Sequence, residues 1–209
     1  RTSNNRIYFF DKDNSVALWV YEDTEPYPYL LSMSGDGFYL AAGNFFDHVT
    51  MFNRTDGLMW DADFSIGGSE GYNPAISNDS NYLVVGGNAG LRLFDPISST
   101  PLWTKFSWEW LAAISGNGSY IATGFDSNIY DDKVILYNNT GDQLWSYFFG
   151  NEGPKSISIS NDGDYIALLT WQNKLYLFHL TRLPQSETPD LTALIMDMLN
   201  SGSNNTMII

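Results

Sequence analysis

The stretch Val134–Trp145, VILYNNTGDQLW, decides the fold of this chain. It indicates a strand ending in an aromatic residue, a polar turn around Gly141, and a second short strand that ends in Leu-Trp. Three other stretches repeat this phrase, and they end at Trp19, Trp60 and Trp103: IYFFDKDNSVALW, VTMFNRTDGLMW and LRLFDPISSTPLW. The four tryptophans lie 41, 43 and 42 residues apart. A regular period of this length is typical of a repeat architecture.

A second phrase recurs between the tryptophan phrases. It consists of an apolar strand ending in Ser, a turn rich in Gly, Asn and Asp, and a strand that begins with Tyr. Its four copies are YLLSMSGDGFYLAAG from Tyr29, NPAISNDSNYLVVGG from Asn73, LAAISGNGSYIATG from Leu111 and SISISNDGDYIALLT from Ser156. Together the two phrases predict units of four antiparallel strands, which we name A to D in chain order. Four strands in about 42 residues make a propeller blade.

Through these two hairpins the chain resembles the WD40-like and PQQ-like β-propeller repeats. The resemblance covers about residues 6–180 and implies an all-β fold with about four blades' worth of sequence, but it implies no activity. The Trp-Asp dipeptide and the Gly-His pair of standard WD40 repeats are absent. We therefore expect propeller repeats over residues 1–180, followed over residues 181–209 by a linker, an amphipathic helix and a flexible tail.

The predicted strands do not divide evenly into blades. The first C–D hairpin, residues 6–21, has no A–B hairpin before it, and the last A–B–C set, residues 155–180, has no D strand directly after it. One hypothesis is a four-bladed ring in which residues 17–21 provide the missing outer strand. The other is a larger ring of about six to eight blades, completed by preceding sequence or by a second chain. Unpaired strand edges favour the larger ring, and we expect the chain not to remain an open monomer.

The segment after residue 180 predicts a short helix. Thr188 is a suitable N-cap and Pro189 a suitable first helical residue. One apolar stripe at helical spacing follows, made of Leu191, Leu194, Ile195, Met198 and Leu199. We expect this helix to pack on the propeller rim; the alternatives are a helix that docks on a partner or a segment that leads into an anchor.

Composition excludes several classes of function. With 10 Lys and Arg against 24 Asp and Glu, the formal net charge is −14, which disfavours unassisted binding to nucleic acid or anionic lipid. Cysteine is absent, so disulfides, thiolate catalysis and cysteine-based zinc sites are excluded. No apolar run is long enough to predict a transmembrane helix. Because the chain begins with Arg1, we expect a processed protein or part of a longer one.

Candidate metal and catalytic residues are few. Asp126, Asp131 and Asp132 lie within one predicted B–C loop, where they could hold a hard cation through oxygen ligands or simply be solvated. The two histidines, His48 and His179, lack zinc-site spacing, and no G-x-S-x-G motif is present. We expect no cofactor and no catalytic residue.

Variable loops predict a binding face. The A–B and C–D turns are short and repetitive, whereas the D–A and B–C loops, which open together at one end of a propeller, differ in length and sequence. Aromatic residues beside carboxylates suit recognition of proteins, glycans or cationic ligands. An ordinary acidic rim is the alternative. The expected members of this face are Phe45, Phe46, Trp108, Tyr130, Trp171, Glu22, Asp61 and Glu70, with Glu109 and Glu152 among the further carboxylates.

Possible glycosylation sites point to the compartment. Asn-x-Ser/Thr sequences occur at Asn53, Asn78, Asn117, Asn138 and Asn204, and most of them fall on predicted turns. Our first hypothesis is a non-catalytic extracellular or cell-surface propeller that binds a protein partner or self-associates. One alternative is a structural subunit of a surface filament or sheath. The other is a PQQ-like or hydrolytic propeller enzyme.

Overall fold

The computed structural model describes residues 6–22, 28–44, 48–64, 73–87, 90–106, 109–125, 132–180 and 193–196. In that part of the chain the regular secondary structure consists of strands alone. They form one two-stranded sheet and four four-stranded sheets, and all pairings are antiparallel. The predicted all-β architecture of four-stranded blades is therefore confirmed.

The sheets follow one another along the chain. The two-stranded sheet, which we call the half-blade, consists of β1 (Arg6–Phe10) and β2 (Ala17–Glu22). Blade 1 consists of β3 (Pro28–Met33), β4 (Tyr39–Asn44), β5 (His48–Asn53) and β6 (Gly57–Asp63). Blade 2 consists of β7 (Asn73–Ile76), β8 (Leu83–Gly86), β9 (Leu91–Phe94) and β10 (Trp103–Lys105).

The other two blades repeat this order. Blade 3 consists of β11 (Glu109–Ile114), β12 (Tyr120–Phe125), β13 (Asp132–Asn138) and β14 (Gln143–Gly150). Blade 4 consists of β15 (Pro154–Ile159), β16 (Tyr165–Thr170), β17 (Leu175–His179) and β18 (Ala193–Met196). Each blade keeps its strands in chain order, from A to D.

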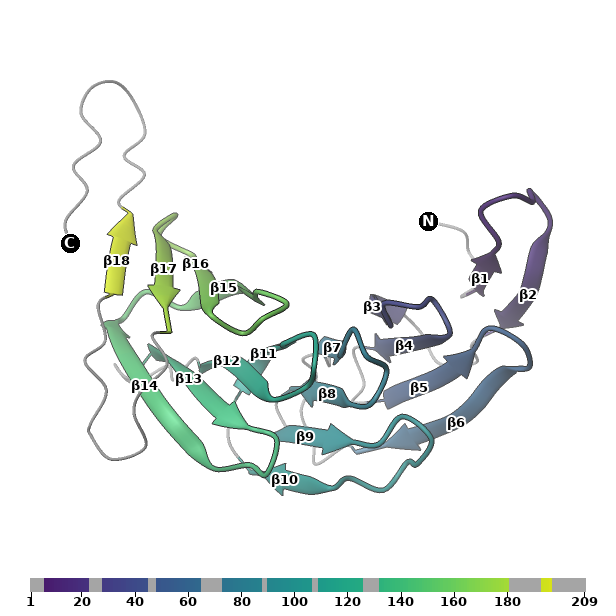
Figure 1. Ribbon diagram of the computed structural model, residues 1–209, viewed down its shortest axis with the longest axis horizontal. Coiled ribbons are helices and arrows are strands. Elements are labelled where there is room, and N and C mark those ends of the chain that lie inside the picture. The colour runs from purple at the N-terminus through teal and green to yellow at the C-terminus, as the bar shows by residue number, and fades with distance from the viewer. Residues whose placement is uncertain are drawn as a thin grey trace.

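The blades stand side by side in an open arc (Figure 1). The A strands β3, β7, β11 and β15 lie along its inner side, and the D strands β6, β10 and β14 lie along its outer side. The half-blade and blade 4 occupy the two ends of the arc. Because β18 is the outer strand on β17 and β2 pairs with β1, the hypothesis of a four-bladed ring closed by residues 17–21 is wrong. Completion of a larger ring stays an expectation.

The missing outer strand of blade 4 comes from the segment expected to be helical. Residues 193–196 form β18, which pairs with β17 in the register Tyr176↔Ile195 and Leu177↔Leu194. The helix prediction is wrong for these four residues, and the rest of the predicted helix lies outside the described residues. The physical reason is that β17 has an unpaired edge, and the apolar run ALIM satisfies its backbone groups as a strand.

The repeated tryptophans join neighbouring blades. Each packs against the aromatic residue that ends the next C strand, with ring centroids 5.2 Å apart for Trp19–Phe52, 5.8 Å for Trp60–Phe94, 6.5 Å for Trp103–Tyr137 and 5.5 Å for Trp145–Phe178. Three of the indole nitrogens also donate to a backbone carbonyl of the next blade: Trp19 to Asn53 at 3.1 Å, Trp60 to Pro96 at 2.8 Å and Trp103 to Asn139 at 2.9 Å. The prediction that the tryptophans occupy equivalent positions between blades is confirmed.

A serine closes each A–B turn. In blade 2, Ser77 Oγ donates to Asp79 Oδ1 at 2.7 Å and accepts a bond from Tyr82 N at 3.0 Å. The same two bonds recur in the other blades at Ser34, Ser115 and Ser160. The turns also connect the blades, because Asp79 N donates to the carbonyl of Gly116 in blade 3 at 2.9 Å. The second repeated phrase therefore forms the A–B turns, and backbone hydrogen bonds link these turns from one blade to the next.

In blades 3 and 4 a glycine lies where the tyrosine of the preceding blade crosses the turn, whereas blade 2 has Ser80 at this position, with a φ of 68°. Gly118 has a φ of 69°, and a Cβ atom placed there would lie 2.2 Å from the ring of Tyr82 in the preceding blade. Gly163 and Tyr120 repeat this contact between blades 3 and 4, at 2.5 Å. Within the described residues there is no helix long and apolar enough to cross a membrane.

Candidate interaction surface and inter-blade cavity

The half-blade leaves one face of β1 open. Ile7 and Phe9 pack into the cluster shared with blade 1 and are each 5% exposed. Tyr8 and Phe10 alternate with them on the opposite face, where they are 44% and 53% exposed and their rings stack with centroids 6.1 Å apart. Because successive strand residues point to opposite faces, this open face is the one that would meet a preceding blade.

Phe10 has four counterparts in the chain, and all four are buried. They are the aromatic residues that end the other C strands and lie under the tryptophan of the preceding blade: Phe52, Phe94, Tyr137 and Phe178. None of them is more than 6% exposed. The exposure of Phe10 therefore comes from the lack of a covering neighbour and not from its place in the repeat.

The exposure of Tyr8, which lies two residues before Phe10, can be compared in the same way. Its counterparts Thr50, Arg92, Ile135 and Tyr176 are all buried. Thr50 and Arg92 are polar, so this position accepts polar as well as apolar side chains where a neighbouring blade covers it. Tyr8 and Phe10 are thus two adjacent members of one interface whose other half is not among the described residues.

Blade 1 is open at the same end. Leu31 and Met33 on its A strand are 58% and 51% exposed. The equivalent residues in blade 2, Pro74 and Ile76, are buried, and Ile76 packs with side chains of blade 1. The half-blade lacks strands A and B, which in the other blades lie against this surface, so β1 pairs on one edge only among the described strands. We call Tyr8, Phe10, Leu31 and Met33, with the free edge of β1, the end surface.

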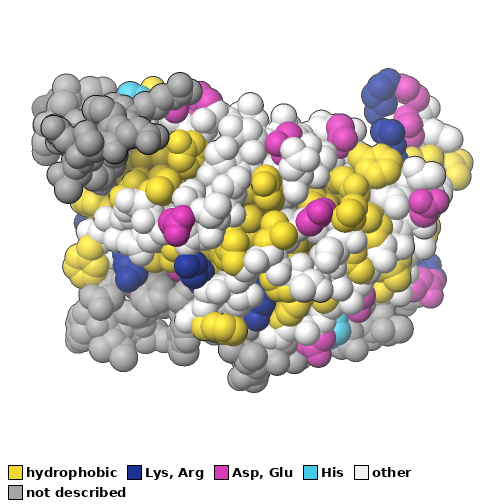
Figure 2. All heavy atoms as spheres, turned by 60° about the horizontal axis from the view of Figure 1, so that its bottom comes forward, with side chains coloured by type: hydrophobic (Ala, Val, Ile, Leu, Met, Phe, Trp, Pro, Cys, Tyr) yellow, Lys and Arg dark blue, Asp and Glu magenta, His cyan; other side chains and the backbone are white. Residues whose placement is uncertain are grey.

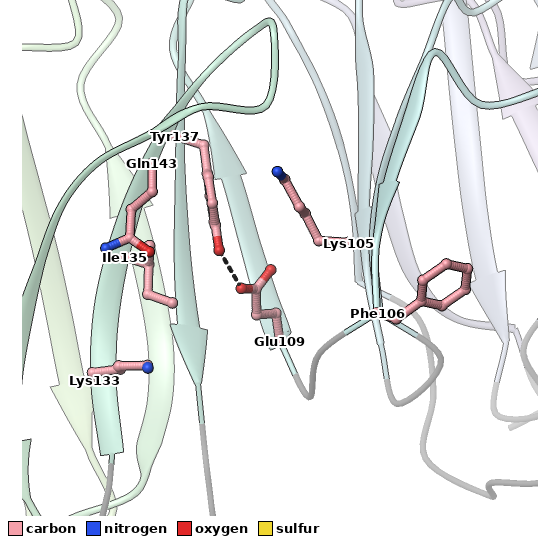
Figure 3. A pocket seen from close by; sticks show the side chains of 7 residues that line it. All are labelled: Lys105, Phe106, Glu109, Lys133, Ile135, Tyr137 and Gln143. Atoms are coloured by element: carbon pink, nitrogen blue, oxygen red, sulfur yellow. Dashed lines mark hydrogen bonds between the residues drawn. The ribbon is translucent and has the colours of Figure 1, made fainter.

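A cavity of about 260 Å³ lies between blades 2 and 3. Lys105 approaches it from the end of β10, and Lys133 and Tyr137 approach it from β13 (Figure 3). Glu109, the first residue of β11, is fully buried, and the hydroxyl of Tyr137 donates to its Oε1 at 2.7 Å. With two ammonium groups and one carboxylate, the lining suits a small anionic group.

The interaction between Glu109 and Tyr137 changes the acidity of the phenol. Burial is the main cause that raises the pKa of Tyr137, and the charge and hydrogen bond of Glu109 raise it further. Tyr137 therefore stays a neutral donor at physiological pH. A buried carboxylate is stabilised by such a donor, because desolvating an ion is costly unless hydrogen bonds replace water.

The cavity has an origin in the repeat. In the half-blade and blade 3 the residue two positions after the tryptophan is Tyr21 or Tyr147, and each ring packs against the aromatic of the next C strand. In blade 2 this position is Lys105, whose Nζ lies 5.8 Å from the centre of the Tyr137 ring. In blade 1 this position is Ala62, and Phe64 packs on Phe94 instead, at 5.5 Å. The cavity therefore lies at an interface where an amine stands in the place of a second ring.

The structure describes three of the eight residues expected on the binding face. Glu22 pairs with Arg6, Asp61 accepts a bond from Thr50 Oγ1 at 2.9 Å, and Trp171 is 62% exposed beneath Lys155. They belong to the half-blade, blade 1 and blade 4, and the binding face stays a prediction. The other five expected members lie outside the described residues: Phe45, Phe46, Glu70, Trp108 and Tyr130.

Two further carboxylates expected on that face are not rim residues. Glu109 is buried at the cavity, and Glu152 binds Lys174 and accepts a bond of 2.9 Å from the Tyr176 hydroxyl. On the face drawn in Figure 2, acidic side chains lie scattered between neutral and hydrophobic ones. Acidic composition therefore does not translate into one continuous acidic patch on this face.

The candidate metal residues have a different outcome. Asp132 is 1% exposed, and its Oδ2 accepts a bond of 2.7 Å from Gly153 N, which ties β13 to the loop before β15. Its role in the described structure is to hold this loop. Asp126 and Asp131 lie outside the described residues. Among the described side chains no group of three or more metal-ligating residues is assembled.

The four described sequons fall into two groups. Asn78 and Asn117 lie exposed on A–B turns. Asn53 and Asn138 are half-buried at the ends of C strands, where their side chains bond to the following turn. Glycosylation stays a prediction at all four positions, and Asn204 lies outside the described residues.

Sequence reasoning missed the end surface itself. It located the unpaired hairpin, but it did not single out Tyr8, Phe10, Leu31 or Met33. The sequence offers only their register, because the repeat aligns Phe10 with Phe52 and Met33 with Ile76.

These blades define the chain as a β-propeller repeat protein. No protein-family model matches the sequence, and no curated protein matches it. Solved structures share the fold. A chain of a mitotic checkpoint complex superposes with a TM-score of 0.69 at 18% identity, over 85% of this chain and 57% of that chain.

Two further structures give the same result. Hydrazine synthase from Kuenenia stuttgartiensis has a TM-score of 0.70 at 12% identity, over 93% of this chain and 60% of that one. The β-propeller domain of Cps50 (Swd1) from Myceliophteria thermophila has a TM-score of 0.70 at 10% identity, over 90% and 64%. This chain thus spans about three fifths of the length of the chains it matches. At these identities the likeness shows the fold alone, and one of these neighbours carries the name of an enzyme.

Proposed function

We propose that this chain is a non-catalytic protein-interaction or assembly module of the extracellular space or cell surface. Further strands, from preceding sequence or from a partner, would extend the free edge of β1 and cover the end surface. The observation that carries this proposal is the exposure of Tyr8, Phe10, Leu31 and Met33, whose counterparts in blade 2 and beyond are packed between blades. Apolar patches beside an unpaired strand edge are typical of interaction sites.

The solved neighbours are consistent with this role. One of them is a chain of a mitotic checkpoint complex, and its propeller fold is shared by this chain. The support for an extracellular setting is the pair of exposed sequons at Asn78 and Asn117. Self-association through the end surface would make the chain a structural subunit, and the experiment below separates that outcome from binding to a different protein.

Site-specific photo-crosslinking tests the proposal. Benzoylphenylalanine is placed at position 8 of the full chain, and at position 148 as the control. Phe148 on β14 is 54% exposed, so it matches the end surface in accessibility without belonging to it. In the cells that naturally make the protein, we expect one dominant adduct from position 8 and none from position 148. Mass spectrometry identifies the adduct as another protein, a second copy or another segment of the same chain, and the last outcome would assign the end surface to completion of the propeller. Equal labelling from both positions would refute the end surface as the docking site.

A further inference from the structure

The interface between blades 3 and 4 shows how this fold accommodates a lysine and a carboxylate between two blades. Glu152 pairs with Lys174 and accepts a hydrogen bond of 2.9 Å from the hydroxyl of Tyr176. Two rings of the D strand β14 lie beside this group, with the centroids of Tyr147 and Phe149 at 6.2 and 5.7 Å from that of Tyr176. The two charges therefore balance each other, and aromatic rings pack beside them.

The interface between blades 2 and 3 repeats these two charges. Lys133 lies four residues before Tyr137, the aromatic that ends its C strand, and so corresponds to Lys174. Glu109 begins an A strand and Glu152 lies just before one. Glu109 also accepts a hydrogen bond from a tyrosine hydroxyl, that of Tyr137, at 2.7 Å. Here the group borders the cavity of about 260 Å³.

One additional cation distinguishes the cavity from the interface between blades 3 and 4. Lys105 stands where blade 3 has Tyr147, so the lining holds two ammonium groups and one carboxylate. Within the described part of the chain Lys105 makes no ion pair, and its Nζ lies 5.8 Å from the centre of the Tyr137 ring. The pKa of Asp142, outside the lining, is lowered mainly by the hydrogen bond of Thr140, and Lys105 is the smallest cause. One positive charge in the lining is thus left for a ligand to balance.

The lining also has an apolar part. The buried side chain of Ile135 and the ring of Tyr137 face the space that Lys105 and Lys133 approach from the two blades (Figure 3). The volume is just below the roughly 300–1,000 Å³ of pockets for drug-sized ligands, so it suits a smaller molecule. A phosphate group carries about 1.5–2 negative charges at neutral pH, more than the lining balances beside Glu109. A carboxylate supplies the single charge.

We propose that the cavity between blades 2 and 3 binds a small organic monocarboxylate. Its carboxylate pairs with the ammonium group of Lys105, and its apolar body lies against Ile135 and the ring of Tyr137. Hydrogen bonds between such charged groups are roughly twice as strong as neutral ones. The inference is independent of the proposed function, because the end surface belongs to the half-blade and blade 1 and contributes no residue to this cavity.

Titration of small ligands into the full chain tests the site. Sodium benzoate is the probe, benzamide is its uncharged counterpart of nearly the same shape, and sodium phosphate tests for a general anion site. Each is added to isotopically labelled protein, and binding is followed by the amide shifts of residues 104–106 and 133–137. We expect saturable shifts at these residues with benzoate, and at least ~tenfold weaker binding of benzamide and of phosphate.

Matched variants separate the charge from the space. Lys105→Gln removes the ammonium group and should weaken benzoate binding at least ~tenfold. Lys105→Tyr places the ring of blade 3 at the equivalent position and should abolish binding, because that ring takes the room of the ligand. The control is Lys155→Gln, which removes the same charge from blade 4, where the ammonium lies 5.1 Å from the centre of the Trp171 ring. It should bind benzoate like the parent, and circular dichroism confirms that all three variants stay folded.

The opposite results are equally specific. Equal affinity for benzoate and benzamide, phosphate binding as tight as that of benzoate, or parent-like binding to Lys105→Gln would overturn the inference. Benzoate shifts that spread over all blades without saturating at residues 104–106 and 133–137 would overturn it as well. Photo-crosslinking at position 8 tests the proposed function separately, so either proposal can fail without the other.

Discussion

The indole nitrogen of Trp103 donates a hydrogen bond of 2.9 Å to the carbonyl of Asn139, which lies 36 residues later in the next blade. This bond connects the end of one repeated phrase to the turn of the next copy. It makes each tryptophan part of two blades, so its removal affects the interface and not only its own strand.

Replacing Trp103 should therefore measure the strength of one blade interface. Trp103→Ala is expected to lower the free energy of unfolding by about 3 kcal/mol, the lower end for large aromatics because the ring is half-buried. Trp103→Phe should lose about 1 kcal/mol, since it keeps most of the stacking and loses the hydrogen bond. Urea denaturation measures both values. Trp171→Ala is the control, and an equal loss there would contradict this assignment.

Gly118 and Gly150 separate backbone strain from steric contact. Both have positive φ, 69° and 82°, but a Cβ at Gly118 would meet Tyr82 at 2.2 Å, whereas nothing lies within 4 Å of one at Gly150. Gly150→Ala is expected to cost about 1–2 kcal/mol from strain alone. Gly118→Ala should cost clearly more. Equal melting temperatures for the two variants would show that Tyr82 moves aside freely.

The raised pKa of Tyr137 predicts that part of the protein's stability is lost at alkaline pH. Its pKa is raised in the folded protein, so the unfolded chain releases this proton at a lower pH than the folded one does. The resulting stability is fully present below the ordinary tyrosine pKa of about 10, and it is lost as the pH rises above that value. Denaturation at pH 8 and pH 11 should show a smaller pH-dependent loss in Tyr137→Phe than in the parent.

The same substitution should also lower stability at neutral pH. Tyr137→Phe removes the donor that reaches buried Glu109, which is expected to cost about 1–3 kcal/mol. Tyr82→Phe is a suitable control, because its hydroxyl makes only a 3.5 Å contact with Asn139. A parent-like stability of Tyr137→Phe at pH 8 would mean that the bond to Glu109 contributes little.

Asn117 is the expected first site of glycosylation. It is exposed on the A–B turn, where its Oδ1 accepts bonds from Ser115 and Ser119, whereas Asn53 and Asn138 are half-buried. Protein purified from its natural source should lose mass on treatment with an N-glycosidase, and a recombinant secreted Asn117→Gln variant should migrate faster than its parent. Unmodified Asn117 in secreted material would remove the main support for the extracellular setting.

The repeat made the blades predictable. A period near 42 located Trp19, Trp60, Trp103 and Trp145, and the turn residues located the hairpins, because both signals are local in sequence. The end of the chain could not be read in the same way. The run around Leu194 has helical spacing, but the unpaired edge of β17 determines its conformation as β18, and that edge is visible only once the blade is assembled.

The sites were less predictable than the fold. Glu109 has the sequence context of a loop carboxylate, yet the approach of blade 2 buries it beside Tyr137. Exposure of Phe10 depends on the absence of a neighbour, which no property of its own phrase reveals. Both features arise between repeats, where sequence period alone gives no distance or accessibility.

The half-blade interface also has a direction. Each of the four repeat tryptophans packs against the next blade and each receiving aromatic faces the previous one, so an arc of such blades has two chemically different ends. Two copies joined around a twofold axis at β1 would place Phe10 against Phe10, with no indole between them. A head-to-tail pair would lack it as well, because the last D strand, β18, reads ALIM. Repetition of this contact before β1 would therefore require a strand with a tryptophan of its own.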